Sequence, residues 1–228
     1  MYACMPLAGG YFLIPNFITH IHGNEFVPIC SVCMKNKICL VTGANTGIGK
    51  ATAEGLARQG AIVLMVCRNP LKGEAARQEI MERTDNRQVR LYLCDLSLLS
   101  QVRRLASHIR QDFNRIDVLV SNAAAFFTRF ELTEEGFERQ WVINHLSNFL
   151  LVNLLLDLVK KAAPARIIIV SSKGNYKGNI HFGNLNLQQG YTGLKAYRQS
   201  KLANVLFTYE LARQLKGTGV TANTLHPG

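Results

Sequence analysis

The sequence predicts an α/β fold in which a doubly wound parallel sheet forms a single domain of about six strands. Short apolar runs alternate with longer helical segments from Ile38 onward, which is typical of parallel strands covered by helices on both faces. The glycine-rich stretch TGANTGIG (42–49) directly follows the first apolar run. With 228 residues and 48% hydrophobic content, the chain can bury one core of ordinary density.

Six apolar runs predict the strands in chain order: ICLV (38–41), AIVLMVC (61–67), VRLYLC (89–94), IDVLV (116–120), RIIIV (166–170) and VTANTL (220–225). Five segments that complete the alternation are expected to be helices: 47–59, 70–83, 98–113, 133–161 and 194–215. The first is rich in alanine and can pack closely on a sheet, and the second has Pro70 in its first turn, where helices favour proline. For the fourth helix, we expect Thr133 to be the N-cap, with Glu134 and Glu135 in the first turn.

The glycine-rich stretch predicts a phosphate-binding turn between the first strand and the first helix. A P-loop is excluded because five residues separate Gly43 from the Gly49-Lys50 pair, and because Ala51 replaces the hydroxyl residue that would hold magnesium. Gly43, Gly47 and Gly49 instead suit a dinucleotide turn of the Rossmann-like type, in which glycines bring backbone against a pyrophosphate at a helix N-terminus. The alternative is a tight strand-to-helix turn without a ligand.

The formal net charge of +11 comes from Lys and Arg residues that are spread between acids, without a basic block or interleaved aromatic residues. We expect a solvated basic surface first, and attraction to anionic lipid or a phosphorylated cofactor second. Nucleic acid is the weakest of the three interpretations, so no nucleic-acid partner is expected.

Residues 1–36 are predicted to be an apolar leader ahead of the domain at 37–228. Glu25 is the only charged side chain among the first 34 residues, but Pro6, Pro15 and polar residues interrupt the segment, and no run reaches the ~18 apolar residues that a membrane span needs. The leader also lacks the basic n-region and the cleavage site of a signal peptide. We expect loose association with a membrane surface, or a flexible apolar leader.

The six cysteines do not predict a metal site. Cys39, Cys67 and Cys94 lie in or beside apolar runs, where reduced core thiols are expected. Cys30 and Cys33 form a C-x-x-C, with one cysteine and two histidines upstream as conceivable zinc ligands, but no second C-x-x-C or H-x3-H follows. We therefore interpret the pair as incidental.

Two polar residues directly follow predicted strands, at the edge where parallel sheets bind ligands. Arg68 follows the second strand and favours NADP(H), because a guanidinium pairs with the 2′-phosphate, whereas a carboxylate there would bind the ribose 2′-hydroxyl of NAD(H). Lys50 is a candidate helper; the alternatives are NAD(H) as cofactor and an ordinary surface role for Arg68. Asp95 follows the third strand and suits an adenine amino group or the cap of the next helix.

Tyr197 and Lys201 are the candidate acid/base pair. Their i, i+4 spacing places both side chains on one face of a helix. A phenol is a poor acid because its reference pKa is about 10, but an adjacent ammonium favours the phenolate and lowers that value. Such a phenol can donate a proton to a carbonyl or accept one from an alcohol. Ser171 or Ser172, at the end of the fifth strand, could polarise the same oxygen.

The order of these parts resembles the short-chain dehydrogenase/reductase family over nearly all of Lys37 to Gly228. The matching stretches are TGANTGIG, CDLS, SNAA, Asn144 within WVINHLSNFLL, IIIVSS and AYRQSKLAN. CRNPLKGE and the stretch from AYRQSKLANVLF to the end resemble the retinol-dehydrogenase-like branch. Relatives continue beyond the final LHPG into a further strand, so the resemblance implies a domain shortened at its C-terminal end, with the usual C-terminal strand missing.

The resemblance implies four catalytic residues. Tyr197 would be the acid/base, Ser172 would hold the substrate oxygen, and Lys201 would bind the nicotinamide ribose and lower the pKa of the phenol. Asn144 would anchor a water that links Lys201 to solvent. The alternatives are a core amide for Asn144 and a turn serine for Ser172. The residues implied to contact the cofactor are Gly43, Asn45, Thr46, Gly47, Ile48, Gly49, Arg68, Asp95, Leu96, Asn122, Ala123, Tyr197, Lys201, Pro227 and Gly228.

Two functions follow as hypotheses. The first is an NADP(H)-dependent oxidoreductase that transfers a hydride between the nicotinamide and a small lipophilic alcohol or carbonyl compound, such as a retinoid. The second is a shortened, catalytically inactive form that binds cofactor or a partner, because SNAA replaces the usual N-N-A-G and the C-terminal region is short. The resemblance also implies a homodimer through the two long helices, and an intracellular protein that is cytoplasmic or associated with an endoplasmic reticulum or mitochondrial membrane.

Overall fold

The computed structural model describes residues 21–22, 25–26 and 34–227, and the chain divides into two units, 1–33 and 34–228. In the first unit, the described residues form two short antiparallel strands, β1 (Ile21–His22) and β2 (Glu25–Phe26). Most of the predicted apolar leader, including its C-x-x-C pair, lies outside the described residues.

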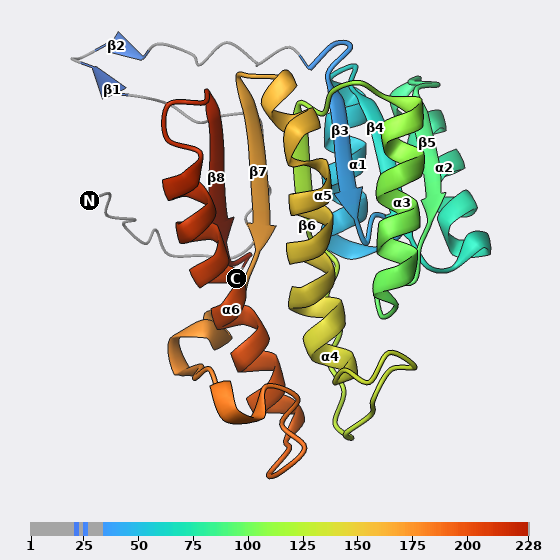
Figure 1. The fold of residues 1–228 in the computed structure, drawn as a ribbon. Coiled ribbons are helices and arrows are strands. Elements are labelled where there is room, and N and C mark those ends of the chain that lie inside the picture. Colours follow the sequence, from blue (N-terminus) through green and yellow to red (C-terminus); the bar gives the residue numbers. More distant parts are fainter. Residues whose placement is uncertain (1–20, 23–24, 27–33, 228) are drawn as a thin grey trace. The chain divides into compact units, whose positions relative to one another are not determined.

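The second unit is built on one parallel sheet of six strands, as predicted (Figure 1). The strands are β3 (Ile38–Thr42), β4 (Ile62–Cys67), β5 (Val89–Leu93), β6 (Val118–Ser121), β7 (Ala165–Val170) and β8 (Val220–Leu225). Their order is β5-β4-β3-β6-β7-β8, and all neighbours are parallel. The chain leaves β3 toward β4 on one side and later returns to β6 on the other. The carboxyl ends of β3 and β6 therefore form the switch point where such sheets bind ligands.

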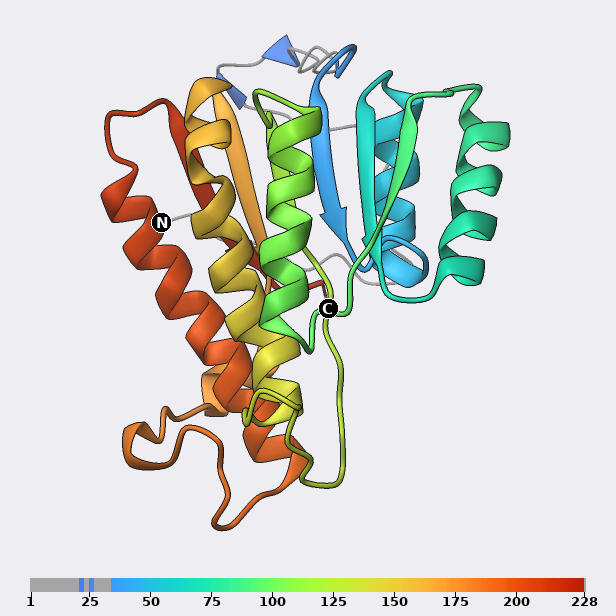
Figure 2. The ribbon, with the colours of Figure 1, turned by 45° about the vertical axis from the view of Figure 1, so that its right-hand side comes forward.

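Helices cover both faces of this sheet (Figures 1 and 2). One face packs against α1 (Gly47–Arg58) and α2 (Pro70–Thr84), and the other packs against α3 (Leu99–Asp112), α5 (Ser147–Lys161) and α6 (Gly193–Gln214). Successive residues of β3 belong to opposite cores, since Cys39 and Val41 face the first pair of helices and Leu40 faces the other three. This alternation explains why the strands are apolar on both faces.

The long helix predicted from Thr133 begins instead at Arg139. It consists of α4 (Arg139–Trp141), a π-helical turn η1 (Val142–Leu146) and then α5. Gly136 has a φ of +81° and reverses the chain ahead of the helix. The N-cap is Glu138, whose buried carboxylate accepts hydrogen bonds from the first N–H groups of α4.

The glutamate expected in the first turn of that helix caps a different one. Glu135 accepts hydrogen bonds from the backbone N–H groups of Leu99 at 2.7 Å and Ser100 at 2.9 Å, which lie at the N-terminus of α3. A carboxylate satisfies free N–H groups at any nearby helix start, so sequence position alone assigns it to the wrong helix.

The continuous stretch Arg139–Lys161 is long and apolar enough to cross a membrane by length and composition. Within it, α5 packs on the sheet through buried residues such as Leu151, Leu155 and Val159. Core helices of folded domains can be equally long and apolar, and this packing accounts for the apolar character of the stretch.

Beyond the carboxyl ends of the strands, the chain forms the region that carries the site. Two short 3₁₀ turns, η2 (Lys173–Lys177) and η3 (Phe182–Asn184), connect β7 to α6. Figure 1 shows this orange segment, α4 and the start of α6 extending past the strand ends. Thr192 is the N-cap of α6, and its side chain accepts a hydrogen bond from the backbone N–H of Lys195.

Candidate active site

The glycine-rich turn between β3 and α1 combines close packing with an open side. Gly43 and Gly47 have φ values of +67° and +54°, which glycine adopts without strain. A Cβ on Gly49 would lie 2.2 Å from the carbonyl oxygen of Gly43 and 2.5 Å from Nδ2 of Asn122, whereas a Cβ on Gly47 would meet no atom within 4 Å. Gly49 is thus required for packing, and Gly47 lies in the exposed segment 46–48.

The N-terminus of α1 suits an anion. Its N-cap, Thr46, has an extended backbone and makes no side-chain capping bond, and the backbone N–H of Lys50 is the donor to the carbonyl of Thr46. The earlier N–H groups of a helix have no acceptor within it, and the helix dipole places positive potential there. The exposed, uncapped turn therefore fits a pyrophosphate.

Thr42 fastens this turn to the end of β6, a role that sequence reasoning missed. Its buried hydroxyl accepts hydrogen bonds from the backbone N–H groups of Asn122 and Ala123, both at 3.0 Å. The Asn122 side chain donates in return to the carbonyl of Thr42 at 3.0 Å. The sequence signal for this role was a hydroxyl residue at the end of an apolar strand, directly before a glycine. The backbone N–H groups that Thr42 bonds lie 80 and 81 residues away in the chain.

Arg68 and Asp95 lie together at the ends of β4 and β5. Nη1 of Arg68 is 3.8 Å from Oδ2 of Asp95, and the arginine side chain is 61% exposed. The other carboxylate oxygen of Asp95 accepts from the N–H and the hydroxyl of Ser97 at 2.9 and 2.7 Å. Asp95 therefore shapes the turn before α3 rather than capping the helix, and leaves Arg68 accessible. Leu96, next in the chain, is buried.

Lys50, the candidate helper of Arg68, forms an ion pair with Glu79. The pair joins α1 to α2 and lowers the pKa of the Glu79 carboxyl, mainly through the hydrogen bond from Lys50. The Lys50 ammonium is thus hydrogen-bonded to a carboxylate, whereas the guanidinium of Arg68 is 61% exposed and lies 3.8 Å from its carboxylate neighbour, Asp95.

Tyr197, Lys201 and the turn that carries Ser172 meet beyond β7. Nζ of Lys201 is 5.7 Å from the centroid of the Tyr197 ring, so the i, i+4 spacing does bring the two side chains together. Ser172 is the N-cap of η2, and its Oγ accepts a hydrogen bond from the backbone N–H of Gly174 at 3.2 Å. A Cβ on Gly174 would lie 3.4 Å from the Tyr197 ring, so this turn packs on the phenol. Phe126 contacts the same ring edge-on, with centroids 5.8 Å apart.

Lys201 is almost completely enclosed. It is 2% exposed, and Nζ donates a hydrogen bond to the backbone carbonyl of Val170 at 3.0 Å. Burial lowers the pKa of this amine to about 8, because the low-dielectric interior disfavours the charged form. The hydroxyl of Ser171 donates to the backbone carbonyl of Lys201 at 2.9 Å and fixes this turn of α6 against β7. At neutral pH the ammonium therefore remains the main form, and its carbon stem is held in place.

Asn144 lies in the π-helical turn and is fully buried. Its side chain accepts from the backbone N–H of Ala125 at 2.7 Å and donates to the carbonyl of the same residue at 3.0 Å and to Oγ of Ser200 at 3.1 Å. Its own backbone carbonyl accepts from the side-chain amides of Asn148 and Asn204, both at 2.8 Å. These contacts tie the π-helical turn both to α6 and to the loop after β6.

Two glutamines hold the site region together and were not singled out from the sequence. Gln140 accepts from the backbone N–H of Phe127 at 2.6 Å and donates to the carbonyl of Gly193 at 2.9 Å. Gln199 accepts from the N–H of His181 at 3.0 Å and donates to the carbonyl of Leu185 at 2.8 Å. Both are buried. A helical glutamine gives no sequence signal of burial, because this residue type is mostly found on surfaces.

The remaining predicted positions lie at the strand ends. Asn45 is partly exposed in the glycine turn, and Pro227 is exposed just after β8. Gly228 lies outside the described residues. Among residues 21–22, 25–26 and 34–227, no group of three or more His, Cys, Asp or Glu side chains could hold a metal ion.

The chain is similar to known proteins over this whole unit. Residues 37–228 match the family model for short chain dehydrogenases. The chain is 48% identical over 206 residues to Retinol dehydrogenase 14 of Mus musculus, covering 86% of this chain and 61% of that protein. It is 46% identical over 198 residues to Retinol dehydrogenase 11 of Homo sapiens, covering 87% and 62%. It thus spans about three fifths of the length of these curated relatives.

Solved structures agree in fold and in sequence. An uncharacterised protein from Mycobacterium paratuberculosis is 41% identical with a TM-score of 0.76, covering 86% of this chain and 69% of that chain. A short chain dehydrogenase from Escherichia coli CFT073, solved in complex with NADPH, is 27% identical with a TM-score of 0.71, covering 86% and 78%. The resemblance inferred from the motifs is confirmed, and the protein belongs to the short-chain dehydrogenase family, in its retinol-dehydrogenase-like branch.

Proposed function

We propose that the protein is an NADP(H)-dependent oxidoreductase that transfers a hydride between the nicotinamide and a small lipophilic alcohol or carbonyl compound, such as a retinoid. One observation carries the proposal. The Tyr197 ring lies beside the Lys201 ammonium and the Ser172 turn, at the carboxyl edge of the same sheet that carries the uncapped glycine turn.

The cofactor is proposed to lie along this edge. The N–H groups of residues 46–49 would bind the pyrophosphate, the exposed guanidinium of Arg68 would pair with a 2′-phosphate, and Lys201 would bond the nicotinamide ribose. When bound, the nicotinamide would supply or accept the hydride. The environment of Arg68 supports NADP(H) over NAD(H). The neighbouring carboxylate, Asp95, already accepts hydrogen bonds from Ser97 and lies 3.8 Å from the guanidinium, so the guanidinium can bind a 2′-phosphate.

The proton chemistry is assigned to the chain's own residues. Tyr197 is partly exposed and would donate its proton to a carbonyl oxygen in reduction, or take one from an alcohol in oxidation. The Lys201 ammonium attracts the negative charge that develops on the phenolic oxygen as the proton leaves. Ser172 would donate a hydrogen bond to the same substrate oxygen.

A lipophilic substrate is supported by apolar side chains that remain exposed on the elements that carry the candidate site. Phe126 is 53% exposed and touches Tyr197, and Leu194 in the first turn of α6 is 47% exposed. Tyr176 in η2 is 76% exposed. Exposed apolar residues on the elements that carry the candidate acid suit a substrate with a hydrocarbon body.

The test is turnover by the purified 228-residue chain with NADPH and a panel of aldehydes that includes retinal. Tyr197→Phe should reduce the rate by roughly 10²–10⁴-fold, the usual contribution of a positioned acid. Tyr209→Phe is the matched control, since Tyr209 lies on the same helix and is 71% exposed. Equal rates for the two variants would refute the assignment. Saturable NADPH binding without turnover in the unmodified chain would instead favour the binding-only function.

We extend the proposal to assembly and location. The rings of Phe149 in α5 and Phe207 in α6 lie in contact at a tilt of 56°, with centroids 4.9 Å apart, and Phe149 and Leu206 are 46% and 50% exposed. This surface supports a homodimer through α5 and α6, which Leu206→Glu should convert to monomer in light scattering.

The apolar leader 1–36 supports peripheral membrane contact of an intracellular protein. Flotation of the full chain with phosphatidylcholine vesicles tests that contact.

A further inference from the structure

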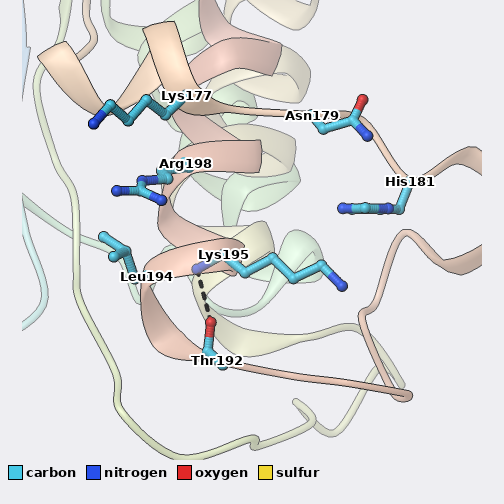
Figure 3. Close-up of a pocket in the computed structure, with 7 residues that line it drawn as sticks. All are labelled: Lys177, Asn179, His181, Thr192, Leu194, Lys195 and Arg198. Carbon is cyan, nitrogen blue, oxygen red and sulfur yellow. Dashed lines mark hydrogen bonds between the residues drawn. The ribbon is translucent and has the colours of Figure 1, made fainter.

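A basic cavity lies on the side of α6 next to the candidate acid. Its volume is about 130 Å³, and it opens between the start of α6 and the segment that precedes that helix (Figure 3). Lys195 and Arg198 reach it from the first turns of α6, while Lys177, Asn179 and His181 come from the preceding segment. A water molecule takes about 30 Å³ in the liquid, so the cavity has room for a tetrahedral anion.

The charges around this cavity have one sign. Three of its lining residues are cations, Lys177, Lys195 and Arg198, and none of its lining residues is acidic. In the part of the chain that the structure describes, none of the three forms an ion pair within 4.0 Å, unlike Lys50 or Arg213. Like charges held together without a counterion repel one another, so an anion that enters the cavity is attracted by all three.

Neutral donors and the helix itself add to this attraction. The cavity is lined by Thr192, the N-cap of α6, a helix of 22 residues. Its N-terminus therefore directs positive potential toward the cavity. The Asn179 amide adds N–H donors, and the His181 imidazole adds a ring nitrogen. The site thus combines cations, polar side chains and a helix start from two separate segments of the chain.

We propose that this cavity binds a phosphate-type anion, either free in solution or as the headgroup of an anionic lipid. Arg and Lys are the residues that recognise phosphate oxygens, through forked and single charge-assisted bonds respectively. The inference does not rest on the proposed function, because anion binding here requires neither cofactor nor turnover.

The location gives the bound anion a defined relation to the candidate acid. Gly174 packs against both residues, since a Cβ there would lie 3.4 Å from the Tyr197 ring and 3.6 Å from Cγ of Arg198. A molecule held by its anionic group at Arg198 would therefore be anchored one residue along α6 from the phenol.

The experiment measures binding of inorganic phosphate to the full chain by calorimetry at constant ionic strength and without cofactor, and the comparison of variants separates this cavity from the glycine turn. Binding should be saturable, and Lys195→Gln combined with Arg198→Gln should weaken it at least about tenfold, since each charge-assisted bond contributes about that factor. The matched control is Arg87→Gln with Arg104→Gln, which removes two exposed cations elsewhere. Arg198→Lys keeps the charge and should retain binding, and circular dichroism verifies that each variant folds.

A second arm uses phosphatidylcholine vesicles with and without phosphatidylserine. Saturable phosphate binding that the double variant loses supports a soluble anion as the ligand. Phosphatidylserine-dependent vesicle binding that the double variant loses, without binding of free phosphate, supports a lipid headgroup. The proposal is overturned if neither probe binds, or if the double variant binds both probes as well as the control does.

Discussion

Replacing Lys201 by methionine tests how strongly the fold opposes the charge that the proposed chemistry needs. The amine is 2% exposed, and burial lowers its pKa from 10.5 to about 8. Since one pKa unit corresponds to about 1.4 kcal/mol, the protonated form is disfavoured in the folded chain by about 3 kcal/mol. Methionine keeps the length and apolar character of the stem but carries no charge.

The sign of the pH dependence follows from which state binds the proton. Between about pH 8 and pH 10.5, the unfolded chain keeps the lysine proton and the folded chain releases it. The unfolded state then binds more protons, so folding stability rises with pH. We expect the free energy of unfolding of the unmodified chain to increase by about 3 kcal/mol relative to Lys201→Met between about pH 7 and pH 10.5.

Guanidinium unfolding provides the assay, with the fluorescence of Trp141 as the probe, because it is the single tryptophan and is buried. Lys216→Met is the matched control. Lys216 is exposed after the end of α6, so the stability difference caused by its replacement should not change over this pH range. If the Lys201→Met difference is as constant with pH as that of the control, burial does not destabilise the ammonium and the reasoning is wrong.

Four further changes probe the cofactor side. Thr42→Val leaves two backbone N–H groups at the end of β6 without their acceptor, and should lower the free energy of unfolding by at least about 2 kcal/mol; an unchanged denaturation midpoint would contradict this role. Gly49→Ala forces a Cβ to 2.2 Å from a carbonyl oxygen and should destabilise the fold by about 3 kcal/mol. Gly47→Ala should cost only about 1–2 kcal/mol of left-handed strain and mainly weaken NADPH binding, so equal destabilisation by the two alanines would count against this division of roles. Arg68→Gln should weaken NADPH binding about tenfold or more and leave NADH binding unchanged, as measured by nicotinamide fluorescence; a parallel loss of both cofactors would show that Arg68 does not select the 2′-phosphate.

The strands were predicted well because their signal is local. The continuous apolar runs of β3 to β8 need no knowledge of their neighbours, since each strand is buried on both faces. The contact between the Tyr197 and Lys201 side chains was predictable for the same reason, because i, i+4 spacing on a helix brings side chains together wherever that helix lies.

The predictions that failed or were absent concern partners far away in the chain. Thr133 suits an N-cap by residue type, but the helix begins after the left-handed Gly136, and its N-cap is the buried Glu138. Thr42 bonds groups 80 residues away, and Gln140 bonds a carbonyl 53 residues away. No local pattern indicates which distant backbone group a side chain will meet.

Local sequence patterns are enough to predict the succession of strands and helices along the chain, the glycine positions of the turn and the contact of a phenol with an amine. The fold had to be known to see that Lys201 is enclosed and bonded to Val170, that Asn144 binds the loop after β6, and that three cations without an ion-pair partner among the described residues line one cavity beside α6. The physical reason is that periodicity follows from backbone geometry within one segment. Burial, ion pairing and charge density depend instead on which segments the sheet order brings together.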